Sequence, residues 1–328
     1  MNGGKVIKVS VIVPVYNSVR HLPKSLESIL EQTLTDIEVI CVDDCSTDGS
    51  REYLESIQDP RLRVVNLPGN RGAGVARNTG MDVASGEYIY FMDSDDWIDR
   101  DYLEVLSKVA DSENRNIVLN TNFKREYKEG ESGMVVRHDP KEGLLAPGRY
   151  PASTAQAYAF PSLWIRLYRR KFLIDNDIRF PETLRRSEDV YFTSLAGLLE
   201  SEAFVIQGPC YHYLQRESSL SASRDVNGLN FLAYHLLYKE LVRRRISLEG
   251  VKLFYTGQVA VSSVELFEFI RGFLSSVEPW VRSNIQAYNE YVLYFMDAIL
   301  SCGDFDSFRE RFGTVPAISF VRRKGLIR

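Results

Sequence analysis

Short apolar runs alternate with segments of helical periodicity over the first 120 residues. The runs are rich in β-branched residues and predict buried strands at 9–13, 38–42, 62–67 and 88–92. Between them, apolar residues recur every three or four positions, which predicts helices within 22–30, 46–57 and 74–84. This alternation predicts an α/β fold with a central, mostly parallel sheet that carries flanking helices on both faces.

The pattern changes twice further along the chain. Residues 123–159 are charged and contain glycine and proline, and residues 164–180 mix apolar residues with arginines. This region is either a long connection on the active-site side or the second half of the same domain. After about residue 227 the apolar positions become aromatic and helically spaced. We therefore predict one domain over 1–226 and a helical C-terminal extension over 227–328.

Composition narrows the possible partners and location. The formal net charge of -4 arises from 44 acidic and 40 basic residues, so the chain lacks the global basic field that collects nucleic acid. The four cysteines lack metal-ligand spacing and are expected to be reduced thiols. No uncharged stretch reaches the roughly 20 apolar residues that span a bilayer. We expect a cytoplasmic protein that binds no nucleic acid.

The residues that follow the first two predicted strands are polar. Ligands of a doubly wound sheet gather beyond the carboxyl ends of its strands. Pro14, Tyr16 and Asn17 follow the first strand, where the ring could stack on a base or the segment could simply form a turn. Asp44 follows the second strand, where it could cap a helix or accept a hydrogen bond from a uracil-like imide.

The fourth strand is followed by Asp93-Ser94-Asp95-Asp96-Trp97. Carboxylates at positions i and i+2 of an extended chain project to the same side, close enough to share a hard divalent cation and the diphosphate that it bridges. An EF-hand is excluded because Ile98 stands where its loop needs glycine and because a strand precedes it. A haloacid-type phosphatase would carry its aspartate nucleophile after the first strand and a small hydroxyl residue downstream. Here Trp97 follows the acidic residues, which disfavours this class of enzyme. A metal-diphosphate site is the leading interpretation.

A glycine-bearing segment, 70–78, opens the third predicted helix. It is not a dinucleotide-binding fingerprint, because Arg77 occupies the third glycine position and the segment follows the third strand. A helix N-terminus with Arg77 one turn inside it suits an anionic ligand. The alternative is a glycine-rich loop that permits close packing.

Together, these motifs resemble those of glycosyltransferase family 2, a family of inverting enzymes with the GT-A fold, a Rossmann-like fold of nucleotide-diphospho-sugar transferases. The matching segments cover roughly the first 110 residues and lie at 11–17, 42–49, 70–78 and 86–96. Four coincident motifs in this order are far more specific than any one of them.

The resemblance implies a nucleotide-diphospho-sugar donor, usually linked to uridine diphosphate (UDP). The residues that it places around the donor are Pro14, Tyr16, Asn17, Asp44, Asn70, Arg77, Asp93, Ser94 and Asp95. Asp93 and Asp95 form the DXD motif of such enzymes. Asp95 would ligate Mn2+ or Mg2+ directly, and Asp93 would more often meet the ribose or sugar.

Two elements of the second half extend the resemblance. Glu188-Asp189 resembles the pair that opens a helix beside the acceptor, with the aspartate as general base, although alone it would be an ordinary acidic helix start. His212, Arg216 and Ser219 resemble an HxxxRxxS element that closes over the diphosphate, with the histidine near the metal. On the acceptor side we place Asp96, Trp97 and Glu188.

These features predict an inverting hexosyl- or N-acetylhexosaminyl-type transferase acting in cell-surface polysaccharide or glycan biosynthesis. Its partners would be the nucleotide-sugar donor and a carbohydrate or lipid-linked glycan acceptor. A sugar nucleotidyltransferase is the rival enzyme, but it would carry a glycine-rich loop with arginine and lysine after the first strand, where this chain has 14–17. A catalytically silent binding protein with this fold is the rival from another class.

The extension carries two short basic patches, at 243–245 and 320–328. They are either solvated helix faces and an ordinary terminus, or a peripheral contact with the anionic inner face of the cell membrane. The aromatic stripes before the second patch suggest a core or a homodimer seam.

Overall fold

A computed structural model describes residues 6–127, 136–137, 145–152, 155, 162–185 and 187–215, and six single positions between 233 and 244. The chain divides into two compact units, Met1–Ser223 and Arg224–Arg328. The predicted domain limits at 226 and 227 remain a prediction. The following description concerns the first unit unless stated otherwise.

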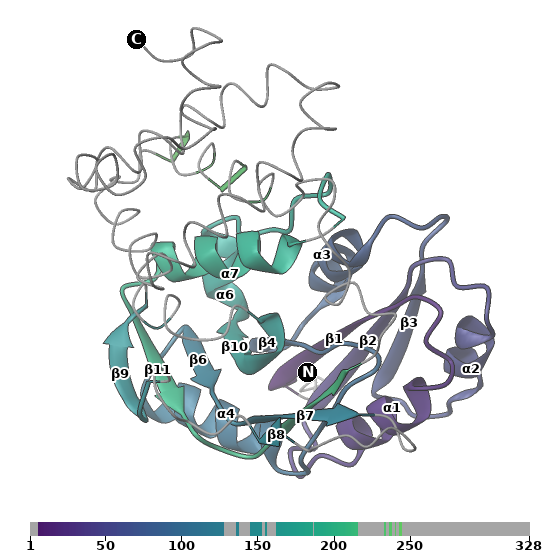
Figure 1. The fold of residues 1–328 in the computed structure, drawn as a ribbon, viewed down its shortest axis with the longest axis horizontal. Helices are drawn as coiled ribbons and strands as arrows, with labels where there is room; N and C mark the ends of the chain where they lie inside the picture. The colour runs from purple at the N-terminus through teal and green to yellow at the C-terminus, as the bar shows by residue number, and fades with distance from the viewer. Residues whose placement is uncertain are drawn as a thin grey trace, which may run out of the picture. The chain divides into compact units, whose positions relative to one another are not determined.

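An eight-stranded sheet forms the centre of this unit (Figure 1). Across the sheet the strands are β3 (Leu62–Asn66), β2 (Ile37–Asp43), β1 (Val9–Val15), β4 (Tyr88–Phe91), β10 (Arg166–Arg169), β6 (Ile117–Asn120), β11 (Glu202–Ile206) and β9 (Gly148–Pro151). The first four are parallel, as predicted, whereas β10 pairs antiparallel with both β4 and β6. The region after residue 123 thus supplies further strands to the same unit, which corresponds to the second of the two interpretations above.

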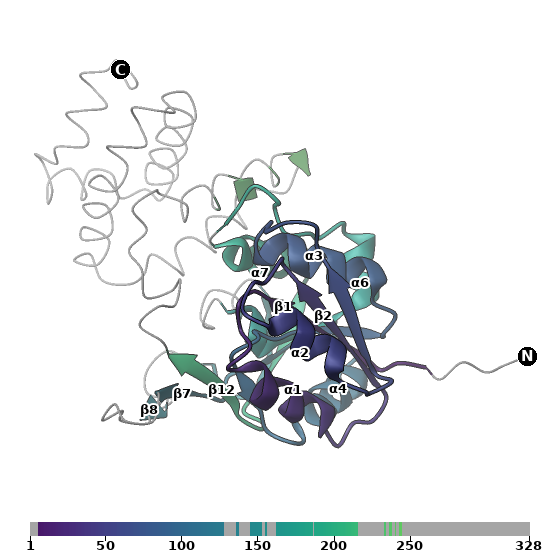
Figure 2. The same cartoon turned by 90° about the vertical axis from the view of Figure 1, so that its right-hand side faces the viewer.

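Helices cover both faces of the sheet. The helices α3 (Ala73–Val83), α6 (Arg170–Asp175) and α7 (Glu188–Leu199) lie on one side, and α1 (Leu22–Leu30) and α4 (Tyr102–Ser112) lie on the other (Figures 1 and 2). A further helix, α2 (Ser50–Ser56), packs beside β2 and β3. Because both faces are covered, the apolar residues of β1 are fully buried, which is why this strand has a continuous apolar run.

Helix α3 approaches β1 closely. Gly80 faces the strand, and a Cβ atom at this position would overlap the side chain of Ile12. Glycine is therefore required for the helix to lie against the sheet at this distance. The same close approach holds the N-terminal turn of α3 over the carboxyl ends of the strands.

Aromatic packing fixes α7 onto the sheet. The Phe180 and Phe192 rings stack with centroids 4.1 Å apart, and both meet Phe91 of β4 edge-on. Tyr168 of β10 meets Phe192 edge-on at 5.5 Å. These contacts bury the face of α7 that carries Phe192 and so determine where the start of the helix lies.

A second, four-stranded sheet runs in the order β5 (Trp97–Ile98), β12 (Tyr211–Gln215), β7 (Phe123–Tyr127) and β8 (Val136–Arg137). Its strand β5 directly follows the acidic motif after β4, and its pairing sets Trp97 opposite His212. The sheet therefore connects the DXD segment to the strand that carries the predicted HxxxRxxS histidine.

Within the described residues, no helix is long and apolar enough to span a membrane. In the second unit, Arg243 and Arg244 both pair with Glu240, at 2.5 and 2.6 Å. Arg243 is 62% exposed, whereas the side chains of Arg244 and Glu240 are only 15% and 17% exposed. The patch at 320–328 lies outside the described residues.

Candidate functional site

The polar residues predicted at the strand ends come together at one edge of the sheet. Strand β1 lies between β2 and β4 and runs parallel to both, so the residues that follow Val15, Asp43 and Phe91 emerge on the same side (Figure 1). Helices α3 and α7 begin at this edge, bringing the motif 70–78 and the Glu188-Asp189 pair to it.

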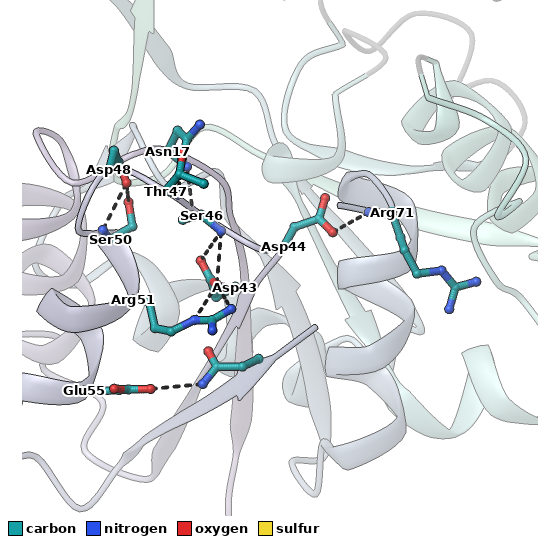
Figure 3. Close-up of polar contacts among 11 residues, drawn as sticks. Asn17, Asp43, Asp44, Ser46, Thr47, Asp48, Ser50, Arg51, Glu55 and Arg71 are labelled. Carbon is teal, nitrogen blue, oxygen red and sulfur yellow. Dashed lines mark hydrogen bonds and ion pairs between the residues drawn. The ribbon is translucent and has the colours of Figure 1, made fainter. Parts of the chain in front are cut away.

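The segment after β1 combines one exposed ring with a structural turn. Tyr16 is 49% exposed, so its ring is available to a ligand, and Pro14 is half-buried. Asn17 has a φ of 50° and accepts a hydrogen bond of 2.8 Å from the backbone N–H of Thr47 (Figure 3). The turn interpretation therefore holds for Asn17, which joins the loops after β1 and β2.

The two aspartates that end β2 have separate structural tasks. Asp43 is fully buried, pairs with Arg51 at 2.9 Å and accepts from the N–H of Ser46 (Figure 3). Asp44 is 3% exposed, and its two oxygens accept from the backbone N–H groups of Arg71 at 2.6 Å and Gly72 at 2.7 Å. The anion at the start of α3 is thus the protein's own Asp44.

This arrangement bears on two of the predicted donor contacts. Asp44 occupies the N–H groups of Arg71 and Gly72, which lie directly before the first residue of α3, and each of its oxygens can still accept a further hydrogen bond. Its predicted contact with a uracil imide, and that of the α3 N-terminus with a diphosphate, therefore stay predictions. Asn70 is exposed, and its side-chain oxygen accepts from Arg185 Nη1 at 2.9 Å. Asp44 and Asn70 both make hydrogen bonds that hold the loop in front of α3.

Arg77 lies at the centre of a buried charge cluster. Its guanidinium pairs with Asp93 at 2.8 Å through Nη2 and with Glu188 at 2.7 Å through Nη1, and only 7% of its side chain is exposed. Burial alone would lower the pKa of Arg77, but Asp93, Glu188 and Asp189 raise it above its ordinary value. Arg77, which was predicted to bind the diphosphate, therefore has two carboxylates of the protein as its partners.

Asp189 is the carboxyl group most altered by this cluster. The residue keeps part of its surface open to solvent, but atoms crowd the carboxyl group itself. Burial, and then the negative charge of Glu188, raise its pKa to about 7, against the opposing effect of Arg77. Its Oδ1 accepts from the N–H of Val190 at 2.8 Å. A carboxyl group with such a pKa can take up and release a proton near neutral pH.

The DXD residues differ in their surroundings. Asp93 keeps 34% of its side chain exposed although one oxygen pairs with Arg77. Asp95 is half-buried, and Ser94 is buried, its Oγ lying 2.8 Å from Ser18 Oγ. Ser94 thus ties the motif to the loop after β1.

Asp93 and Asp95 are the predicted ligands of a divalent cation. Mg2+ in nucleotide sites takes one or two carboxylates and completes its shell with phosphate oxygens and water. Asp93 and Asp95 lie near enough to Asp96 that their charges help to raise its pKa well above the ordinary value, after burial as the largest cause. A cation at Asp93 and Asp95 would offset this repulsion.

Asp96 has a structural environment. It is fully buried and accepts from Tyr211 Oη at 2.5 Å and from the backbone N–H of Leu214 at 2.8 Å. A carboxyl group enclosed in this way exposes no surface, so its predicted placement on the acceptor side gains no support here and stays a prediction. Its two bonds fasten β12 to the DXD segment.

His212 is held within the second sheet. Its ring stacks on Trp97 with centroids 5.2 Å apart, and its Nε2 lies 2.9 Å from Asp99 Oδ1. Lys24 Nζ also lies over the Trp97 ring, 3.1 Å from its centroid. Trp97 is therefore packed against two side chains and only partly exposed.

Among the described residues, no three His, Cys, Asp or Glu side chains form a group that could hold a metal ion. The predicted set of Asp93, Asp95 and His212 is therefore not assembled, because pairing of β5 with β12 directs His212 to Trp97 and Asp99. The two carboxylates remain as the candidate ligands. Arg216 and Ser219 lie outside the described residues.

Two residues of this region were not assigned a task from the sequence. Asn78 both accepts from the N–H of Phe180 at 3.0 Å and donates to its carbonyl at 2.8 Å. Arg185 lies against Gly72, where a Cβ atom would come within 3.1 Å of its side chain. Asn78 lies in the segment 70–78, and Arg185 lies shortly before Glu188. Only the fold shows that these two parts of the chain touch.

The sequence and structure match known proteins. Residues 10–176 match the model of the family described as Glycosyl transferase family 2. The succinoglycan biosynthesis protein ExoO of Rhizobium meliloti is 32% identical over 257 residues, 75% of this chain and 71% of ExoO. The poly(ribitol-phosphate) beta-N-acetylglucosaminyltransferase TarS of Staphylococcus aureus is 32% identical over 69% of this chain and 39% of TarS.

A further match covers a smaller share of its protein. The glycosyltransferase GlyA of Streptococcus pneumoniae is 32% identical over 65% of this chain, which spans only 31% of GlyA.

The crystal structure of S. aureus TarS residues 1–349 in complex with UDP superposes with a TM-score of 0.66 at 26% identity. The superposition covers 87% of this chain and 80% of that one. A second structure of the same fragment, in complex with UDP-GlcNAc, gives the same TM-score. The fold is the predicted GT-A type. A family match over about half of the chain, with ExoO aligned over three quarters of it, shows that the chain belongs to glycosyltransferase family 2.

Proposed function

We propose that the chain is an inverting glycosyltransferase that moves a sugar, of the hexosyl or N-acetylhexosaminyl type, from a UDP-linked donor to a hydroxyl group of a cell-surface glycan. The observation that carries this proposal is the convergence of Asp93, from the donor motif, and of Glu188 and Asp189, from the start of α7, around Arg77. Donor and acceptor chemistry thereby meet at one place.

The relatives support the choice of substrates. TarS has been crystallised with UDP and with UDP-GlcNAc, and its name describes transfer of N-acetylglucosamine to poly(ribitol-phosphate). ExoO is named for biosynthesis of a polysaccharide. The chain spans less than half of TarS, so the acceptor is assigned only as a carbohydrate or lipid-linked glycan.

Each residue of the site has a task in this reaction. Tyr16 offers an exposed ring on which the uracil base can stack. Asp93 and Asp95 would hold the divalent cation, Mn2+ or Mg2+, which would supply positive charge to the leaving diphosphate. Asp189 takes the proton from the acceptor hydroxyl, whose oxygen forms a bond to the anomeric carbon as the bond to the diphosphate breaks and its electron pair leaves with UDP.

The protonation state of Asp189 sets the expected pH dependence. Its pKa is raised to about 7, so a large share of the molecules carries the ionised, basic form at neutral pH. Because the base must be ionised, transfer should fall about tenfold for each pH unit below this pKa.

A donor assay tests the proposal. The chain is incubated with UDP-GlcNAc, UDP-glucose and GDP-mannose, with Mn2+ or with EDTA, and release of free nucleoside diphosphate is followed. We expect metal-dependent release of UDP, which stops in Asp189→Asn while calorimetry shows nearly unchanged UDP binding. Asp175→Asn, on the exposed surface of α6, is the matched control.

The outcomes separate the alternatives. Full activity of Asp189→Asn would refute the assignment of the base. Pyrophosphate release from a nucleoside triphosphate and a sugar phosphate would identify a sugar nucleotidyltransferase. UDP binding without turnover on any donor would identify a silent binding protein. Inversion requires a product whose anomeric configuration is opposite to that of the donor, which NMR determines.

A cytoplasmic location, peripheral contact with the inner face of the cell membrane and a homodimer remain proposals. They can be tested by cell fractionation, by liposome flotation with anionic lipid and by light scattering of the purified chain.

A further inference from the structure

Side-chain contacts join the start of α3 to the segment that leads into α7, more than 100 residues away in the sequence. Asn78 makes two hydrogen bonds to the backbone of Phe180, and Arg71 pairs with Glu182 at 2.6 Å. Arg77 makes the contact nearest to the helix, with Glu188 at 2.7 Å. The two segments therefore form one connected body at the edge of the sheet.

Arg77 differs from the other contacts because it also reaches the donor motif. Its Nη2 pairs with Asp93, directly after β4, while its Nη1 pairs with Glu188, the first residue of α7. The guanidinium is planar and presents its N–H groups in a fixed fork, so the two carboxylates are held at a set separation. Lysine carries the same charge on a single nitrogen and cannot reproduce this fork.

The environment of Arg77 favours an internal role over contact with a phosphate. Its side chain is 7% exposed, and its Nε is buried without a hydrogen-bond partner among the described residues. Asp93 takes a hydrogen bond from Nη2 and Glu188 takes one from Nη1, so each of these nitrogens is already paired with a carboxylate. With 7% of the side chain exposed, little of the guanidinium is open to a diphosphate.

We propose that Arg77 is a positioning residue that ties Asp93 to Glu188 and thereby sets the distance between the donor motif and the base Asp189. The catalytic part of this inference rests on the proposed function. The contacts of Arg77 with Asp93 and Glu188 are a property of the fold and do not depend on that function. It replaces the expected role of Arg77 as a ligand of the donor diphosphate.

The packing of α7 limits the part of the helix whose position depends on Arg77. Phe192, one turn into the helix, is held by stacking on Phe180 and by edge contacts with Phe91 and Tyr168. Only the first turn, with Glu188 and Asp189, depends on Arg77. A misplacement of a reacting group by about 1 Å can lower a rate on the order of 100-fold, so a loosened first turn should affect turnover strongly.

The test compares Arg77→Lys, Arg77→Met, Glu188→Gln and the double variant Arg77→Met/Glu188→Gln with the parent chain. Arg71→Met is the matched control, because Arg71 joins the same two segments through Glu182 but is 53% exposed. Arg77→Lys preserves the buried charge. If Arg77→Met does not fold, the measurements are made on Arg77→Lys instead.

Three measurements are made on each variant. Hydrogen exchange of the peptide covering 187–191 reports on the first turn without requiring activity, with the peptide covering 192–199 as the internal reference. Calorimetry gives the affinities for UDP, with Mn2+, and for uridine. Turnover with the best donor gives kcat and KM.

We expect exchange at 187–191 to rise at least tenfold in both Arg77 variants and to stay unchanged in Arg71→Met. UDP affinity should remain within about threefold of the parent, whereas kcat should fall at least tenfold. Because Arg77 and Glu188 act as one unit, the double variant should turn over no more than about threefold more slowly than Arg77→Met.

Two outcomes would overturn the inference. One is unchanged exchange at 187–191 in the Arg77 variants. The other is a loss of more than tenfold in UDP affinity, with uridine affinity and Glu188→Gln unaffected, which would make Arg77 a phosphate ligand. If the parent chain transfers no sugar but exchange responds as expected, the proposed function fails while the positional role of Arg77 stands.

Discussion

Replacing the base should stabilise the folded chain at alkaline pH while it abolishes sugar transfer. Folding raises the pKa of Asp189 from 3.8 to about 7, with burial as the largest cause and Glu188 as the next. Between these two values the folded state holds a proton that the unfolded state releases. The folded state therefore loses stability as the pH rises from about 4 to about 7, and above that the loss is complete.

The magnitude follows from the pKa difference. One pKa unit corresponds to about 1.4 kcal/mol, so an ionised Asp189 costs the folded state at most about 4 kcal/mol at pH 8. The partly open surface of Asp189 reduces this value through solvent screening, and we expect a gain of about 2 kcal/mol for Asp189→Asn at pH 8. Below pH 5 the carboxyl group is protonated in the folded state, and most of the gain should disappear.

Urea unfolding at pH 5 and pH 8 measures this difference. Asp189→Asn should have a higher midpoint than the parent chain at pH 8, and the two midpoints should approach each other at pH 5. Asp175→Asn, which removes an exposed carboxylate paired with Lys171, should show no such pH-dependent difference. A variant less stable than the parent at pH 8 would refute the argument, because it would mean that the ionised carboxylate stabilises the cluster.

Three further predictions address the metal, the core and the second sheet. Asp95→Ala should weaken UDP binding at least tenfold with Mn2+ and leave it nearly unchanged in EDTA, because the carboxylate acts through the cation; equal losses in both would contradict this. Gly80→Ala should lower the free energy of unfolding by about 1–3 kcal/mol, since its Cβ would overlap Ile12, and an unchanged urea midpoint would argue against the close packing. Asp96→Ala should cost about 1–3 kcal/mol because the buried Tyr211 hydroxyl loses its acceptor, whereas the isosteric Asp96→Asn should cost clearly less; equal losses would show that charge matters more than the hydrogen bond.

The first half of the fold could be predicted because its signals are local. Val9–Val15 and Tyr88–Phe91 are buried on both faces, and each has the continuous apolar run that such strands require. The antiparallel strand Arg166–Arg169 was not predicted, since Arg166 and Arg169 interrupt its apolar pattern. Its place between β4 and β6 depends on pairing with strands distant in the sequence.

The candidate site was predicted in composition but not in its internal contacts. Asp93, Asp95 and Asp189 stand where strand ends and helix starts place them, and these are visible in local patterns. His212 shows the opposite case, because its distance from the acidic motif is set by the pairing of β12 with β5. A short motif identifies the kind of side chain without showing which way the strand turns it.

The amino-acid order was sufficient to place the chemical groups at one edge of a parallel sheet, because parallel strands bring their carboxyl ends together and each end is marked by a change from apolar to acidic residues. Only the tertiary structure revealed which of those groups are used internally. Asp44 holds the loop in front of α3, and Arg77 joins Asp93 to Glu188, which lies 111 residues after Arg77 in the sequence. Such contacts arise from the packing of helices on a sheet, and packing depends on side chains far apart in the chain, which no local pattern records.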